Sequence, residues 1–281
     1  MAAIVMDGKA LAAKIKDGVR QQAEGFAKQP GLAVILVGDN PASRVYVNGK
    51  KKDCGECGIY SEEHTLPTET TQEELLKLIE QLNDREEIDG ILVQLPLPRH
   101  LNEKEVLLAI RPDKDVDCFH PFNVGQMMIG EEGFKPCTPA GVMRILEEYG
   151  IDPSGKRCVI VGRSNIVGKP QAMLMVQKNA TVTICHTKTA DLTAECRNAD
   201  ILVAAAGRVG LIRGDMVRDG AVVVDVAMNR NEAGKLCGDV VYEEVAEKAS
   251  YITPVPGGVG PLTRAMLMEN TLLAARMHGK S

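Results

Sequence analysis

The sequence contains no tryptophan, and only 3% of its 281 residues are aromatic. Long apolar runs are also missing: stretches such as 32–37 and 201–206 reach about six residues, whereas a helix needs about 20 to cross a bilayer. Positive charge is not in excess, because 38 acidic residues outweigh 33 Lys and Arg and give a formal net charge of -5. Nucleic-acid binders use stacking platforms and a basic field, so these absences favour small-molecule ligands over a nucleic acid or a membrane.

The apolar content is sufficient for a packed core, since 44% of the residues are hydrophobic and the mean hydropathy is -0.08. Residues 1–6 are too short for the apolar part of a signal peptide, and Asp7 and Asp17 argue against a transit peptide, so we expect a cytoplasmic protein. The cysteines are scattered through ordinary contexts and are interpreted as reduced thiols, at positions 54, 57, 118, 137, 158, 185, 196 and 237.

The first third of the chain alternates helical and strand patterns, which predicts a parallel α/β layer. Asn40 before Pro41 marks a helix start, because Asn accepts the free N–H groups of a first turn and Pro suits the first helical position. Five prolines between residues 96 and 136 indicate an irregular boundary region. The predicted elements are helices over about 8–28, 41–58 and 72–83 and strands at 32–37 and 91–95.

A second α/β series follows the boundary region. Thr138-Pro139 repeats the cap-and-proline signal ahead of a helix whose apolar residues Val142, Ile145 and Leu146 have helical spacing. Such a series is typical of a doubly wound nucleotide-binding domain. Its predicted strands are 158–161, 181–184, 201–205, 221–226 and 251–252, and its helices are 169–178, 190–197 and a last one over 261–277.

A glycine-bounded turn separates the predicted strand 158–161 from the helix that follows it. Backbone N–H groups at a helix N-terminus favour an anion, and glycine lets a diphosphate approach the backbone. We therefore predict a phosphate-binding turn, with the candidate cofactor residues Gly162, Arg163, Ser164 and Gly168. The spacing departs from G-x-G-x-x-G, so a purely structural turn is the alternative.

The next predicted strand is followed by Cys185-His186-Thr187-Lys188, where NAD enzymes usually place an acid for the ribose hydroxyls. No acid is present, and Arg163 and Lys188 would accommodate a 2′-phosphate, which favours NADP over NAD. Thr187 and Lys188 are accordingly candidate cofactor residues. The alternative is that both are solvated surface residues.

Tyr46 and Lys50 lie four residues apart in the predicted helix 41–58 and project from one face. A partly buried lysine near neutrality can exchange protons with a reacting group, whereas an exposed lysine stays protonated. Gln94 lies near the end of an apolar strand, where open α/β sheets bind ligands, and is a candidate for orienting the lysine or a heterocycle. An ordinary surface lysine and an amide that caps its own loop are the alternatives.

Three further patterns carry weaker signals. The aspartates at 113, 115 and 117 resemble a hard-metal loop but lack the glycine and terminal glutamate of a calcium site. Cys54 and Cys57 form a lone C-x-x-C inside a predicted helix, which favours core thiols over zinc. The glycines at 257, 258 and 260 suit either close approach of a flat cofactor ring or an interdomain hinge. No metal site is predicted.

Together these residues resemble the family of bifunctional methylenetetrahydrofolate dehydrogenase/cyclohydrolases over nearly the whole chain. Any one motif is suggestive, whereas the ordered set is specific. Cys118 and Ala227 stand where that family usually has glycine, and a side chain costs about 1 kcal/mol wherever the backbone needs a positive φ. The matching segments, in family order, are 43–59, 94–98, 114–117, 136–139, 162–164 with 167–168, and 253–261.

The resemblance implies a role for each candidate residue. Lys50 would be the central catalytic group, positioned by Gln94, while Tyr46 would pack on the pterin and Asp117 would bind its amino and ring nitrogens. Lys50 would assist proton movement as base, acid or electrostatic orienter. The implied catalytic residues are Lys50, Gln94, Asp117 and Tyr46; the substrate-binding residues are Tyr46, Gln94, Asp117, Pro256, Gly257 and Gly258; the cofactor residues are Gly162, Arg163, Ser164, Gly168, Thr187, Lys188, Gly257 and Gly258.

The resemblance also implies an α/β fold of two domains with an active-site cleft between them. Residues 1–138 would form an N-terminal folate-binding and catalytic domain, residues 139–262 a Rossmann-like NADP-binding domain with a parallel sheet, and residues 263–281 a helix returning to the first domain. The implied reactions are oxidation of 5,10-methylenetetrahydrofolate by NADP⁺ and hydrolysis of the methenyl product to 10-formyltetrahydrofolate. A cytoplasmic homodimer serving one-carbon metabolism and purine biosynthesis is expected.

Three other functions stay open at this point. A monofunctional dehydrogenase, using NADP or NAD, would release the methenyl product without hydrolysing it. A nucleotide-binding protein that has lost catalysis would bind NADP without turnover, and the unusual Cys118 and Ala227 motivate that alternative. A zinc or redox protein built on Cys54 and Cys57 is the weakest candidate.

Overall fold

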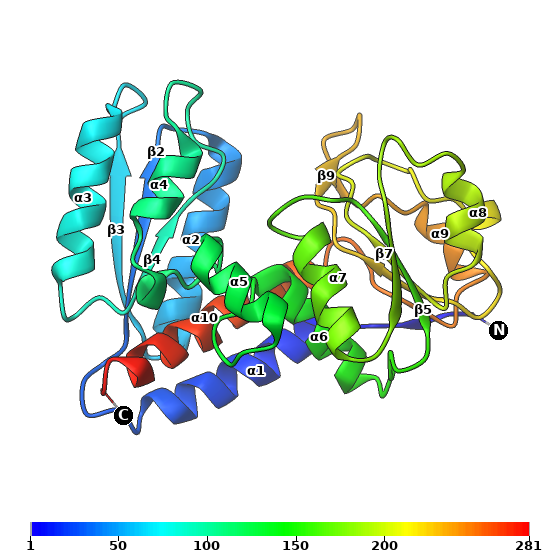
Figure 1. The fold of residues 1–281 in the computed structure, drawn as a ribbon, viewed down its shortest axis with the longest axis horizontal. Helices are drawn as coiled ribbons and strands as arrows, with labels where there is room; N and C mark the ends of the chain where they lie inside the picture. The colour runs from blue at the N-terminus through cyan, green and yellow to red at the C-terminus, as the bar shows by residue number, and fades with distance from the viewer. Residues whose placement is uncertain (1, 281) are drawn as a thin grey trace. The chain divides into compact units, whose positions relative to one another are not determined.

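The computed structural model describes residues 2–280, with a chain that divides into two compact α/β units (Figure 1). Unit 1 consists of Met1–Ala12 and Thr138–Thr263, and unit 2 of Ala13–Cys137 and Arg264–Ser281. Helices α1 (Gly8–Ala23) and α10 (Val259–Met277) each begin in unit 1 and end in unit 2. The expected two-domain α/β class is therefore confirmed.

Unit 1 is built on a parallel sheet with the strand order β1-β11-β8-β7-β5-β6. Because β6 and β7 flank β5 on opposite sides, the carboxyl end of β5 is the point where the strand order reverses, and open α/β sheets bind ligands at such points. The strands are β1 (Ile4–Val5), β5 (Arg157–Val161), β6 (Thr181–Cys185), β7 (Ile201–Ala204), β8 (Val222–Asp225) and β11 (Tyr251–Ile252).

The helices of unit 1 connect these strands and cover the sheet. Val142, Ile145 and Leu146 of α6 are fully buried, as their spacing predicts. The helices are α6 (Cys137–Glu148), α7 (Gly168–Gln177), α8 (Leu192–Arg197) and α9 (Tyr242–Ala246), with the 3₁₀ turn η2 (Gly214–Met216) and the antiparallel pair β9 (Asn229–Arg230) and β10 (Leu236–Cys237).

Unit 2 contains a three-stranded parallel sheet in the order β3-β2-β4, with helices α2 and α3 on opposite sides of it (Figure 1). Every residue of β2 is buried, which explains why its sequence is an unbroken apolar run. The elements are α2 (Pro41–Glu56), α3 (Gln72–Asp84), α4 (Glu103–Ala109), α5 (Pro121–Ile129), the 3₁₀ turn η1 (Pro112–Lys114), β2 (Gly31–Val37), β3 (Tyr60–Leu66) and β4 (Gly90–Val93).

Three features of the backbone differ from the expectation. Helix α1 ends at Ala23 rather than near residue 28, because Gly25 comes two residues later and glycine lowers helix propensity. The stretch 96–136 is not irregular throughout but contains α4 and α5, since Pro121 occupies the first helical position, where it is tolerated. Strand β3 carries no apolar alternation and is missed by the sequence pattern. Within residues 2–280, no helix combines the length and apolarity that a membrane span requires.

Candidate active site

Lys50 and Gln94 form a direct contact in unit 2. Asn40 caps α2 by accepting a hydrogen bond from the Ser43 N–H at 3.2 Å, and Lys50 lies in the second half of this helix. The Lys50 Nζ donates to Gln94 Oε1 at 3.0 Å. Gln94 follows β4 directly, and its Nε2 donates to the Leu95 carbonyl at 2.6 Å. The amide is thus held from both sides, with its acceptor turned toward the lysine.

Lys50 and Asp117 influence each other's protonation. Both residues keep some exposed surface, but their ionisable ends are enclosed by packed atoms. Burial lowers the pKa of Lys50 below its ordinary value, and the Asp117 carboxylate opposes that shift. Burial raises the pKa of Asp117, against the opposing effect of Lys50. Both shifts favour the neutral forms, and paired groups of this kind are suited to proton transfer.

The Cys137 thiol lies beside this pair, at the start of α6. Its Sγ lies 3.5 Å from the Val116 carbonyl, and Asn270 donates to the sulfur from α10 at 3.7 Å. Burial raises the pKa of Cys137 well above its ordinary value, and the neighbouring Asp117 adds to the rise. The group therefore stays a thiol, whose S–H faces acceptors rather than acting as a nucleophile.

Tyr46 lies one helical turn before Lys50 and is 36% exposed. Residues four apart on a helix share a face, so the ring and the amine are presented on the same side of α2. An exposed aromatic face next to a buried amine suits a flat heterocyclic ligand.

The glycine-bounded turn is at the carboxyl end of β5 in unit 1. A Cβ at Gly162, whose φ is +137°, would lie 2.2 Å from the Ala205 carbonyl oxygen, and one at Gly168 would lie 2.2 Å from the Gly162 carbonyl oxygen. The Ser164 hydroxyl accepts from the N–H groups of Val167 and Gly168 at 3.1 and 3.3 Å. The turn is therefore packed backbone on backbone, and Arg163 beside it is exposed.

The β6 loop emerges next to this turn. Val161 and Cys185 are register partners at the ends of β5 and β6, so Arg163 and Lys188 leave the sheet at one edge. His186 N–H donates to the Thr189 hydroxyl at 2.8 Å, and Lys188 N–H donates to His186 Nδ1 at 3.1 Å. These bonds order the loop and leave Thr187 and Lys188 exposed.

The segment 256–258 follows β11 in the same sheet. Gly257 has a φ of +107°, and its carbonyl accepts from the Lys9 N–H at 3.0 Å. Gly258 is packed so closely that a Cβ at Gly8 would lie 1.8 Å from its carbonyl oxygen. Pro256, Gly257 and Gly258 therefore belong to unit 1, whereas Lys50, Gln94, Asp117 and Tyr46 belong to unit 2.

Comparison with known proteins gives one answer for both units. The catalytic domain of tetrahydrofolate dehydrogenase/cyclohydrolase matches residues 6–117, and the NAD(P)-binding domain of the same family matches residues 136–279. The chain belongs to the tetrahydrofolate dehydrogenase/cyclohydrolase family. The resemblance inferred from the motifs is confirmed.

Relatives of the tetrahydrofolate dehydrogenase/cyclohydrolase family cover almost the entire chain. The bifunctional protein FolD of Ruminiclostridium cellulolyticum is 60% identical over 277 residues, 98% of either chain. The crystal structure of the bifunctional enzyme FolD from Campylobacter jejuni matches with a TM-score of 0.97 and 53% identity, covering 98% of this chain and 99% of that one. A Trypanosoma brucei FolD, solved with NADP cofactor and inhibitor, has a TM-score of 0.95, 38% identity and 100% coverage of both chains.

The metal patterns of the sequence have structural explanations in this family member. The Asp115 carboxylate accepts from the N–H groups of Phe119 and His120 at 3.1 and 2.8 Å, which orders the turn after Asp117. Burial raises the pKa of Asp115 to about 6. Cys54 and Cys57 are fully buried thiols. Among residues 2–280, no three His, Cys, Asp or Glu side chains are grouped as a metal site would require.

The two departures from the family pattern differ in backbone conformation. Cys118 has a φ of +59°, the left-handed region that glycine adopts without cost, whereas Ala227 is outside that region. The Cys118 Sγ donates to the Phe134 carbonyl at 3.3 Å and is buried. The strain expected for a side chain therefore applies at Cys118 and not at Ala227.

We expect Cys118→Gly to be more stable than Cys118→Ala by about 1 kcal/mol, since both lose the thiol and only glycine relieves the left-handed strain. Urea unfolding of the two variants measures the difference. Ala227→Gly is the matched control, and there glycine should lower stability by ~0.5 kcal/mol. An alanine variant as stable as the glycine variant at position 118 would contradict the assignment of strain.

Asp239 is a buried residue that sequence reasoning missed. Its Oδ2 accepts from the N–H groups of Ala206 and Gly207 at 2.6 and 3.0 Å, and its Oδ1 accepts from the N–H of Arg208 and from Asn229. These bonds tie the loops that leave β7 and β8 together at the carboxyl edge of the sheet. The local sequence, Gly238-Asp239-Val240-Val241, shows only an aspartate before β-branched residues and does not indicate a loop-ordering role.

We expect Asp239→Asn to lower the free energy of unfolding by about 2 kcal/mol, because the amide NH₂ would face backbone donors instead of accepting from them. Chemical denaturation of the full chain gives the value. Asp219→Asn, on an exposed side chain that forms an ion pair with Lys248, should change stability by less than ~0.5 kcal/mol. Equal stability of the two variants would rule out the loop-ordering role.

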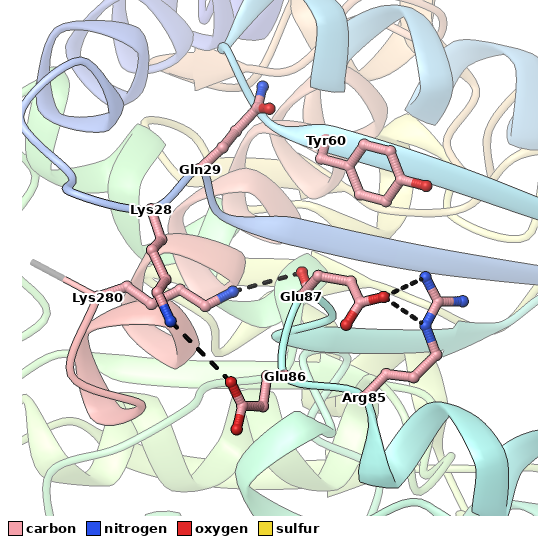
Figure 2. Close-up of a pocket in the computed structure, with 7 residues that line it drawn as sticks. All are labelled: Lys28, Gln29, Tyr60, Arg85, Glu86, Glu87 and Lys280. Carbon is pink, nitrogen blue, oxygen red and sulfur yellow. Dashed lines mark hydrogen bonds and ion pairs between the residues drawn. The ribbon is translucent and has the colours of Figure 1, made fainter.

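A separate hollow of about 520 Å³ lies in unit 2 and contains none of the predicted site residues. Figure 2 shows that its charged side chains pair with one another: Lys28 with Glu86, and Arg85 with Glu87 at 2.9 Å. Lys280 donates to the Glu87 carbonyl at 3.3 Å and to Asp89 at 2.8 Å. The charged side chains that line the hollow therefore already have partners, and we do not consider the hollow a rival to the site around Lys50.

Proposed function

We propose that this protein is a bifunctional enzyme of folate one-carbon metabolism. It oxidises 5,10-methylenetetrahydrofolate with NADP⁺ and hydrolyses the 5,10-methenyl product to 10-formyltetrahydrofolate. The observation that carries the proposal is the hydrogen bond of 3.0 Å from Lys50 to Gln94 in the family's catalytic domain, beside Asp117. Relatives described as bifunctional do not favour the monofunctional or inactive alternatives.

Lys50 moves the proton in the proposed hydrolysis. A neutral amine that donates one N–H to Gln94 keeps its lone pair for the water that attacks the methenyl carbon. One proton of that water ends on the ring nitrogen freed when its bond to the carbon breaks, and the other is released. Asp117 would hold the amino and ring nitrogens of the pterin, and Tyr46 would pack on its face.

The residues of unit 1 fit a dinucleotide. Gly162 and Gly168 lie where a Cβ would clash with neighbouring backbone atoms. Arg163 and Lys188 leave the sheet at the same edge. Ser164 and Thr187 would complete the cofactor contacts, and Pro256, Gly257 and Gly258 would contact substrate, the two glycines near the nicotinamide as well. NADP⁺, when bound, supplies the hydride acceptor, and the two cationic side chains favour its 2′-phosphate over NAD.

We assign residues 1–138 to the folate-binding domain, 139–262 to the cofactor domain and 263–281 to a helix that returns to the first. The bond of 2.7 Å from Asn270 to the Val116 carbonyl supports the last assignment. We further propose a cytoplasmic homodimer whose product feeds purine biosynthesis. The net charge of -5 favours small-molecule partners over nucleic acid.

A two-wavelength absorbance assay tests the proposed function. NADPH formation and methenyltetrahydrofolate are followed separately, with NADP⁺ and NAD⁺ in parallel reactions. We expect NADPH to accumulate without lasting build-up of the methenyl product. Methenyl product that decays only at its uncatalysed rate would identify a monofunctional dehydrogenase, and absence of reduction with either cofactor would identify a binding protein.

A further inference from the structure

A buried carboxylate lies one turn after Lys50 on α2. Asp53 is 2% exposed, and its Oδ1 accepts from Lys16 Nζ of α1 at 2.7 Å. Its Oδ2 accepts no hydrogen bond from the described residues, and Arg264 Nε of α10 lies 3.2 Å away from it. The Arg264 guanidinium is therefore the charge that offsets the burial of this oxygen.

The anchored guanidinium packs directly on the backbone next to Lys50. A Cβ at Gly49 would lie 2.2 Å from Arg264 Nη1 and 3.5 Å from its Cδ. The guanidinium thus occupies the space that glycine leaves open. Any side chain at position 49 would displace Arg264 from α2.

Several groups on different elements act on the Lys50 amine. Gln94, after β4, accepts its hydrogen bond. Burial is the main cause that lowers the pKa of Lys50, and Arg264 on α10 lowers it further. Three groups act in the opposite direction: Asp117 after η1, Cys137 on α6 and Cys54 on α2. Among these neighbours Arg264 is the one that carries positive charge.

We propose that Arg264 is a positioning residue for Lys50: Asp53 holds its guanidinium against Gly49, where it fixes the turn of α2 that carries the amine and places a permanent positive charge nearby. The inference rests on the proposed role of Lys50 in hydrolysis. Because a fixed cation opposes the charging of a second amine, it favours the proton-accepting form of Lys50.

Acylation of Lys50 by acetic anhydride tests the inference without any catalysis. The full chain is labelled across a pH series, and the peptide that carries Lys50 is quantified by mass spectrometry. We expect Arg264→Gln to move the labelling profile to higher pH and to slow acylation at neutral pH about fivefold. Arg264→Lys, which keeps the charge, should restore most of the rate.

Arg276→Gln is the matched control on the same helix, since Arg276 bonds Gln22 and lies over the Phe26 ring instead. Gly49→Ala is a second variant, which displaces the guanidinium without removing its charge from the chain and should shift the profile in the same direction. An Arg264→Gln profile that coincides with that of the unmodified protein overturns the inference, as does an Arg264→Lys profile shifted equally far.

The pH dependence of hydrolysis is the second readout. The limb due to Lys50 should move to higher pH in Arg264→Gln and return in Arg264→Lys, whereas a loss of packing alone would lower the rate equally at every pH. If the unmodified protein hydrolyses no methenyl substrate, the proposed function fails. The labelling experiment then still decides whether Arg264 controls Lys50.

Discussion

Lys50→Met is expected to lower the rate of methenyltetrahydrofolate hydrolysis about a thousandfold, the size of effect that a positioned proton-transfer group supplies. Methionine keeps the length and the apolar stem of lysine but can neither donate to Gln94 nor accept a proton. The fold should tolerate the change, because burial already lowers the pKa of Lys50 and so acts against its charged form. The decay of the methenyl absorbance at constant pH measures the effect.

Lys51→Met is the control for this substitution, since Lys51 is the adjacent residue of α2 and its side chain is exposed. Its hydrolysis rate should stay within about twofold of the unmodified protein. Thermal unfolding of both variants shows whether the fold is retained. Hydrolysis by Lys50→Met within tenfold of the unmodified rate would remove Lys50 from the mechanism.

The sequence pattern predicted best the elements whose burial shows as one continuous run of apolar residues. Strand β2 is apolar at all but its first position because both faces are covered, and the predicted bounds 32–37 differ from Gly31–Val37 by one residue. Strand β3, Tyr60–Leu66, was missed because its polar side chains are satisfied by partners far along the chain. Glu62, for instance, accepts from Arg85 at 2.6 and 2.8 Å, a pairing that local periodicity does not reveal.

The candidate site likewise contains residues that the sequence could reveal and residues that only the folded chain shows. Lys50 and Gln94 could be singled out because Lys50 lies on a helix with a clear start signal and Gln94 lies at the end of an apolar strand. In the structure, β4 brings Gln94 to the lysine. Arg264 gave no signal, because an arginine in an amphipathic helix is ordinary. Its contact with Gly49 joins residues more than 200 positions apart, so only the folded chain shows it.

The environment of Lys50 also explains why the sequence motif alone was weak evidence for a proton-accepting lysine. Lys50, Lys51 and Lys52 are identical side chains in sequence, but Lys51 and Lys52 are exposed, and Lys52 pairs with Glu56 at 3.7 Å. The surroundings of Lys50 disfavour its charged form. A lysine becomes a proton acceptor through its environment, which spacing does not encode.

Gly162→Ala is expected to raise the Michaelis constant for NADP⁺ about a hundredfold, equivalent to ~2.7 kcal/mol of binding energy. The added Cβ would lie 2.2 Å from the Ala205 carbonyl oxygen, and a φ of +137° adds strain of its own. The backbone at the end of β5 must move, and with it the turn that is proposed to hold the diphosphate. Initial rates of NADPH formation at varied NADP⁺ give the constant.

Hydrolysis of added methenyltetrahydrofolate separates this effect from misfolding, because Gly162 belongs to unit 1, whereas Lys50, Gln94 and Asp117 belong to unit 2. Gly162→Ala should therefore keep most of its hydrolase rate, the reverse of the loss expected for Lys50→Met. Gly220→Ala is the matched control: its φ is +80°, but among residues 2–280 no atom beyond the adjacent residues lies within 4 Å of the added Cβ, so it tests strain without a clash. If both glycine variants bind NADP⁺ as the unmodified protein does, the Gly162 turn is structural and the cofactor phosphates are bound elsewhere.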